Sequence, residues 1–118
     1  MDVNRRAFLA GAALAALHPL RLAAAGWRAG VATVDITPRQ SLWMAGFAAR
    51  TQPSQGTAIP LHAKALALED AAGQRLVVVT LDLLGVTGGM ASRISTAVAS
   101  RHKLPRERLL LASSHTHS

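Results

Sequence analysis

The chain has 118 residues, a formal net charge of +7, no cysteine and only 3% aromatic residues. This length accommodates one small domain. The lack of cysteine excludes a disulfide framework and any thiolate metal site, so a bound metal would need nitrogen and oxygen ligands. The basic residues are scattered with few aromatics among them, which argues against a nucleic-acid groove and predicts no nucleic-acid partner.

Residues 1–25 have the form of a twin-arginine signal peptide. Asn4-Arg5-Arg6-Ala7-Phe8-Leu9 supplies the paired arginines, residues 10–17 form a short apolar segment, and residues 23–25 fit a small-residue cleavage site before Gly26. This pattern predicts export by the twin-arginine translocase and a periplasmic or secreted protein. The mature segment would be residues 26–118, in which the net charge falls from +7 to +5 because three arginines and one aspartate are removed.

Two alternatives for this segment are an amphipathic helix of a cytosolic protein and a membrane anchor. The anchor is disfavoured because His18, Pro19 and Arg21 interrupt the apolar run. A membrane-spanning helix needs roughly 20 apolar residues.

Alternation and β-branched residues predict four strands, near 31–36, 62–69, 75–82 and 109–113. The second is rich in alanine, so a helix competes there, but the turn-forming residues 70–74 favour a hairpin with the third. The third strand has a nearly continuous apolar run, which predicts burial on both of its faces.

A helix is expected near 89–103, because Met90, Ile94 and Val98 recur at helical spacing and Leu104-Pro105 would end it. Strand, helix and strand in this order predict a βαβ crossover with parallel strands. The predicted fold class is therefore α/β, with a mixed sheet, as the incomplete N-terminal part of a larger domain.

Candidate site residues follow the two parallel strands. In open α/β sheets, ligands lie beyond the carboxyl ends of the strands, where Asp82, His115 and His117 are expected. If the backbone after Ser113 stays extended, both imidazoles project to one side and suit a divalent metal such as zinc. The alternative is an ordinary polar loop. Asp82 would either orient a metal-bound imidazole or cap the next element.

Three further positions have competing interpretations. The apolar stretch Leu42–Phe47 is either a buried loop that covers a sheet edge or a segment in which Gly46 lets the backbone approach a ligand closely. The residues alone favour the buried loop. His62, in an alternating strand, is expected to be a half-buried packing residue, and His102, near a helix end, to be exposed.

Six segments between residues 30 and 118 carry recognisable motifs. They are Gly30–Pro38, Met44–Phe47, Pro60–Leu66, Leu68–Asp70, Val79–Asp82 and Ser114–Ser118. The closing His-Thr-His-Ser is the most specific of them. In this order the motifs resemble those of the neutral/alkaline (non-lysosomal) ceramidase family.

The resemblance implies a zinc-dependent amidohydrolase that cleaves the N-acyl bond of ceramide to sphingosine and a fatty acid. It implies one zinc ion with His115 as ligand, and His117 as a catalytic residue that helps bind or polarise the scissile carbonyl. Gly46 and Asp82 become substrate-binding candidates. A ceramide-like lipid is the expected substrate, with peripheral contact at a membrane surface.

The sequence departs from the family pattern at His62, where tyrosine is common, and at Ile59, where aspartate is common. The family's other zinc ligands lie far downstream, so the chain as given is expected to be inactive. Two alternatives stay open: a non-catalytic truncated remnant, and a metal hydrolase that acts on another amide or ester.

Overall fold

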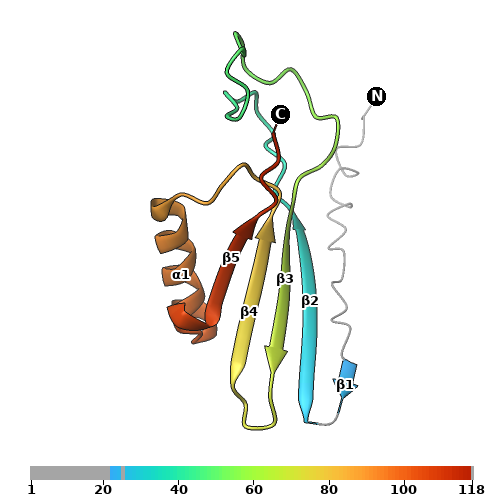
Figure 1. Ribbon diagram of the computed structural model, residues 1–118, viewed down its shortest axis with the longest axis vertical. Helices are drawn as coiled ribbons and strands as arrows, with labels where there is room; N and C mark the ends of the chain where they lie inside the picture. The colour runs from blue at the N-terminus through green and yellow to red at the C-terminus, as the bar shows by residue number, and fades with distance from the viewer. Residues whose placement is uncertain (1–21, 25, 118) are drawn as a thin grey trace, which may run out of the picture.

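The computed structural model describes residues 22–24 and 26–117 (Figure 1). The predicted signal peptide lies outside the described residues except for Leu22–Ala24. The elements in chain order are β1 (Leu22–Ala24), β2 (Trp27–Asp35), β3 (His62–Glu69), β4 (Arg75–Leu81), α1 (Gly88–His102), the 3-10 helix η1 (Arg106–Arg108) and β5 (Leu109–Ser113).

The strands form one five-stranded sheet in the order β1-β2-β3-β4-β5. The pairs β1–β2, β2–β3 and β3–β4 are antiparallel. Strands β4 and β5 are parallel neighbours, and α1 lies between them in the sequence. The predicted α/β class, mixed sheet and βαβ crossover are therefore confirmed. Strand β2 begins earlier than expected, at Trp27, and β1 was not expected. Among the described residues, no helix is long and apolar enough to cross a bilayer.

The hairpin between β3 and β4 explains why the alanine-rich segment is a strand. The Asp70 carboxylate accepts hydrogen bonds from the backbone N–H groups of Ala72 and Gln74, at 2.9 and 2.8 Å. Gly73 has a φ of 77°, a left-handed conformation that glycine adopts without steric cost. Closing this turn places β3 between β2 and β4, where both of its edges are hydrogen-bonded.

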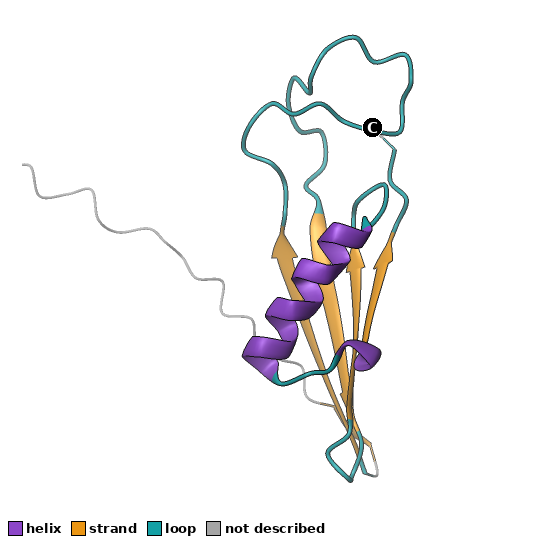
Figure 2. Ribbon diagram, turned by 90° about the vertical axis from the view of Figure 1, so that its left-hand side faces the viewer, coloured by secondary structure: helices purple, strands orange, loops and turns teal. Residues whose placement is uncertain are grey.

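Helix α1 lies alongside β5 (Figures 1 and 2) and has well-defined ends. The Thr87 hydroxyl accepts a hydrogen bond from the Met90 N–H at its start. Lys103 ends it in a left-handed conformation, with its N–H donating to the Ala99 carbonyl. These caps define the two ends of α1, the helix of the crossover from β4 to the parallel strand β5.

Within the described residues, the apolar core is small and lies between the end of α1 and strands β4 and β5. Its buried residues are Leu81, Leu104 and Leu109, at 7%, 5% and 3% exposure.

The expected burial of β4 on both faces is wrong for the described chain, because no described element covers the second face. Val31, Leu66, Val78 and Leu110 are register partners across four strands and share this face. Of these, Val31 and Leu110 are about half exposed, at 52% and 51%.

A charged cluster joins the strands at the hairpin end of the sheet. The buried Glu69 carboxylate pairs with Arg28 of β2 and with Arg75 of β4, whose NH2 lies 2.7 Å away. Hydrogen bonds from Arg75 and Arg28 lower the pKa of Glu69 below its ordinary value of 4.5. This cluster is far from the end of the sheet that carries the histidines.

Candidate functional site

The chain after β5 runs beside the chain after β4. Ser114 N–H donates to the Leu81 carbonyl at 2.9 Å, and Thr116 N–H donates to the Leu83 carbonyl at 3.3 Å. The prediction that the residues after the two parallel strands meet at one edge is therefore confirmed.

The extended path assumed after Ser113 is wrong at His115, which has a φ of 57°. This left-handed conformation is uncommon for a residue other than glycine. It brings the His115 imidazole to the segment after β4, where Nδ1 lies 2.8 Å from the Leu84 carbonyl oxygen. A carbonyl oxygen only accepts hydrogen bonds, so Nδ1 carries the proton and Nε2 carries the lone pair.

His117 is fixed in the same way by a different segment. Its Nδ1 lies 2.6 Å from the carbonyl oxygen of Gly46, 71 residues earlier in the chain. Gly46 has a φ of 97°, and a Cβ atom there would lie 2.9 Å from His117 Nδ1 and 3.3 Å from Leu84 Cδ1. Both the backbone conformation and the close approach therefore require glycine.

The two imidazoles lie next to each other, with ring centroids 4.8 Å apart and ring planes at 73°. Both are exposed. Within residues 22–24 and 26–117, no group of three or more His, Cys, Asp or Glu side chains could hold a metal ion. The described chain therefore brings two nitrogen donors together without a complete set of metal ligands.

The long connection between β2 and β3 is ordered by its own hydrogen bonds. Leu42 N–H donates to Ser54 Oγ at 3.0 Å, and Ser54 N–H donates to the Leu42 carbonyl at 2.9 Å. At its base, Leu61 N–H donates to Thr37 Oγ1 at 2.8 Å, and Thr37 N–H donates to the Asp35 carboxylate at 2.7 Å. The hydrogen bonds from Thr37 lower the pKa of Asp35 below its ordinary value.

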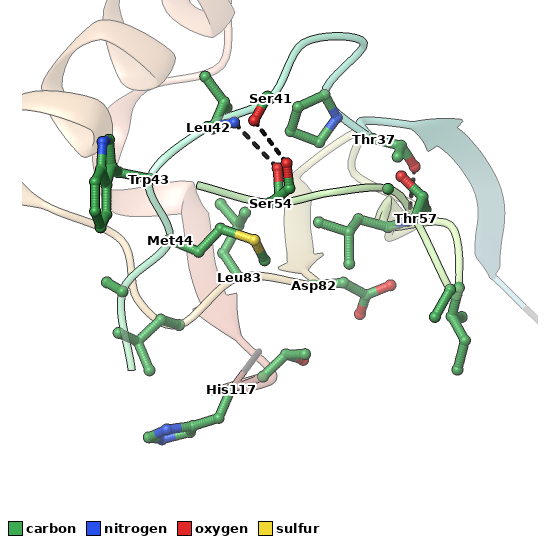
Figure 3. Close-up of a pocket in the computed structure, with 18 of the residues that line it drawn as sticks. Thr37, Ser41, Leu42, Trp43, Met44, Ser54, Thr57, Asp82, Leu83 and His117 are labelled. Atoms are coloured by element: carbon green, nitrogen blue, oxygen red, sulfur yellow. Dashed lines mark hydrogen bonds between the residues drawn. The ribbon is translucent and has the colours of Figure 1, made fainter. Parts of the chain in front are cut away.

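This connection and the segment after β4 line an open cavity of about 980 Å³. Figure 3 shows Met44, Leu83 and Asp82 lining this cavity and His117 at its edge, with the imidazole pointing away from these three side chains. Leu42 and Trp43 also line it, so the apolar stretch 42–47 borders a cavity and does not form a buried cover over a sheet edge. Gly46 is closely approached by the imidazole of His117 from the same chain, and its close approach to a ligand stays a prediction.

Asp82 lines the cavity but holds neither imidazole. Its Oδ2 accepts a hydrogen bond from the His62 backbone N–H at 3.0 Å, and lies 3.9 Å from His62 Nδ1 and 3.8 Å from Lys64 Nζ. Asp82 was expected to orient an imidazole, but the carbonyl oxygens of Leu84 and Gly46 orient His115 and His117 instead. Asp82 joins the end of β4 to the start of β3.

The other two histidines in the described part of the chain have the exposure expected from the sequence. His62 begins β3 and is half-buried, whereas His102 ends α1 and is exposed. Sequence reasoning missed the role of Leu84, because its carbonyl oxygen carries no side-chain signature.

Comparison with protein-family models finds no match, and comparison with curated protein sequences finds none either. Comparison with solved structures finds the neutral ceramidase from Pseudomonas aeruginosa, with a TM-score of 0.73 and 28% sequence identity over 79% of this chain. A structure of ceramidase complexed with C2 matches with the same values. The chain spans 15% of the length of each of these proteins. The resemblance expected from the motifs is therefore confirmed in structure.

Proposed function

Because the chain has the fold of a segment of neutral ceramidase, we propose that it is the N-terminal part of the catalytic domain of a zinc-dependent amidohydrolase. The proposed reaction is hydrolysis of the N-acyl bond of a ceramide-like lipid, in which water is consumed and a fatty acid and a sphingoid amine are released. The observation that carries this proposal is the pair of anchored, neighbouring imidazoles, of which His117 lines the cavity, in a chain similar in structure to ceramidase.

The state of His115 fits a zinc ligand. Metal-binding histidines usually donate their other ring N–H to a backbone carbonyl or carboxylate, which fixes the tautomer and the ring orientation. His115 makes this contact through Nδ1 with the Leu84 carbonyl, so Nε2 is the nitrogen that would bind zinc. Zinc, when bound, supplies Lewis-acid activation of water and of the amide carbonyl.

Besides His115, the described residues supply a second histidine and an apolar lining to the proposed site. His117 lies beside His115, lines the edge of the cavity and is fixed by the Gly46 carbonyl, which suits a residue that contacts the reacting groups. Leu42, Met44 and Leu83 give the cavity an apolar lining, which suits the hydrocarbon portion of a lipid. The remaining zinc ligands are proposed to lie in sequence beyond the described segment.

The proposal also includes contact with a membrane surface. Trp43, Phe47 and Ile59 are 68%, 61% and 76% exposed in the connection that lines the cavity. Residues 36–61 contain two arginines and no acidic residue. Exposed aromatic and aliphatic side chains with basic residues favour binding at an anionic lipid interface. Such contact would place the cavity close to its lipid substrate.

Export by the twin-arginine translocase to the periplasm or the exterior is proposed from the sequence of residues 1–25. This location agrees with an enzyme that acts on lipids outside the cytoplasm.

The decisive assay uses the complete polypeptide encoded by the gene and ceramide with a labelled acyl chain. We expect release of labelled fatty acid, its loss on chelation and its recovery with zinc. Hydrolysis of a simple ester or amide without hydrolysis of ceramide would instead support a metal hydrolase of different specificity. Lack of every hydrolytic activity, in protein shown to be folded, would support a non-catalytic remnant.

A further inference from the structure

A hydrogen bond joins His117 to Gly46 in the connection between β2 and β3. Its carbonyl oxygen lies 2.6 Å from His117 Nδ1. The same connection is closed by the hydrogen bonds between Leu42 and Ser54, so the position of the Gly46 carbonyl is set by an ordered segment.

The contact decides which nitrogen of His117 carries the proton. Because the partner is a carbonyl oxygen, Nδ1 must donate, and a neutral imidazole then presents a lone pair at Nε2. In this tautomer Nε2 of a neutral imidazole is free to accept a hydrogen bond, whereas in the imidazolium form Nε2 donates and the contact of Nδ1–H with the Gly46 carbonyl is kept.

We propose that Gly46 is a positioning residue whose carbonyl oxygen holds His117 through Nδ1–H, so that Nε2 is the ring nitrogen that His117 presents at the proposed site. Glycine is required at this position because a Cβ atom would lie 2.9 Å from His117 Nδ1 and because φ is 97°. This inference rests on the proposed function for its catalytic meaning, but the tautomer itself is independent of any activity.

The test is long-range ¹H–¹⁵N correlation of the histidine side chains in the complete, zinc-free polypeptide, at a pH where His117 is neutral. We expect Nδ1–H to be the dominant tautomer of His117 in the wild type and in Gly56→Ala. Gly56 is a matched control, because it lies in the same connection and an added Cβ meets no atom within 4 Å. Gly46→Ala is expected to lose the preference for this tautomer.

Gly73→Ala controls for backbone strain, because Gly73 also has a positive φ but has open space around its Cβ position. A dominant Nε2–H tautomer in the wild type would overturn the proposal, and this measurement does not depend on a variant that folds. An unchanged tautomer in folded Gly46→Ala would also overturn it.

If the complete polypeptide hydrolyses ceramide, a double-mutant cycle adds a second readout. Gly46→Ala is expected to lower kcat/KM strongly in the wild type but less than about threefold in His117→Ala, because residues that act through one another are not additive. Equal losses in both backgrounds would show that Gly46 does not act through His117. Failure of hydrolysis alone would reject the proposed function and leave the tautomer measurement to decide this inference.

Discussion

Replacing Asp82 by alanine tests whether this carboxylate is a structural contact at the edge of the cavity. Its Oδ2 accepts the backbone N–H of His62 at 3.0 Å, and its side chain is 27% exposed. A hydrogen bond to a charged group contributes about 1.5–3 kcal/mol when buried. Because water partly replaces the carboxylate at this exposure, we expect Asp82→Ala to cost about 1–2 kcal/mol locally.

The measurement is amide hydrogen exchange, which reports local opening residue by residue. A cost of about 1–2 kcal/mol should make the His62 amide exchange about 5- to 30-fold faster. Asp82→Asn keeps an oxygen acceptor and should change the rate less than about fivefold. The partly exposed contacts of Asp82 with Lys64 and with the His62 ring should add little.

An unchanged His62 exchange rate in Asp82→Ala, together with a loss of substrate turnover, would refute this reasoning. Asp82 would then act on the substrate, as the family resemblance suggested. Faster exchange in Asp82→Ala with near-normal exchange in Asp82→Asn would support the structural role.

Three further predictions concern other parts of the chain. Glu69 has a depressed pKa in the folded state, so its charged form contributes stability above pH 4.5 that is lost as pH falls through the lower folded pKa. Glu69→Gln should therefore lower the melting temperature at pH 7 and reduce the decrease in melting temperature below pH 4.5. An unchanged dependence of melting temperature on pH would contradict this. Leu109→Ala should lower the free energy of unfolding in urea by about 2–5 kcal/mol, and Leu110→Ala by at most about 1 kcal/mol, because the two residues are 3% and 51% exposed. Equal losses of unfolding free energy would mean that both faces of β5 are buried. Trp43→Ala should weaken binding to anionic vesicles about tenfold, whereas Leu76→Ala, at the opposite end of the sheet, should leave it unchanged. Equal binding by the wild type and both variants would exclude the proposed membrane contact.

The strands and helix were predictable where the pattern is local. Residues 75–81 and 109–113 contain nearly continuous apolar runs, and α1 has a helical period with a proline beyond its end. The start of β2 was missed because Trp27 to Gly30 shows no clear alternation; its pairing with β3 defines it instead.

Burial was less predictable than secondary structure. An apolar run shows that a strand tolerates burial, but a second covering layer has to come from other parts of the polypeptide. The exposed row that contains Val31 and Leu110 therefore has the sequence of a core face without a described element packed on it.

The candidate site was predictable in its residues and not in its geometry. Parallel strands β4 and β5 bring Asp82 and the two histidines to one edge, as expected from topology. The left-handed conformation of His115 and the anchoring carbonyls of Leu84 and Gly46 depend on tertiary contacts. The unusual apolar stretch around Gly46 was the available signal for its place at the site.

The most direct test of the central claim is the zinc content of the purified complete polypeptide and two histidine variants. His102→Ala is the matched control, because His102 is exposed at the end of α1 and distant in sequence from the strand-end motif. We expect stoichiometric zinc in the wild type and in His102→Ala, and its loss in folded His115→Ala, because His115 Nε2 is the proposed ligand. Stoichiometric zinc retained by His115→Ala would contradict the account.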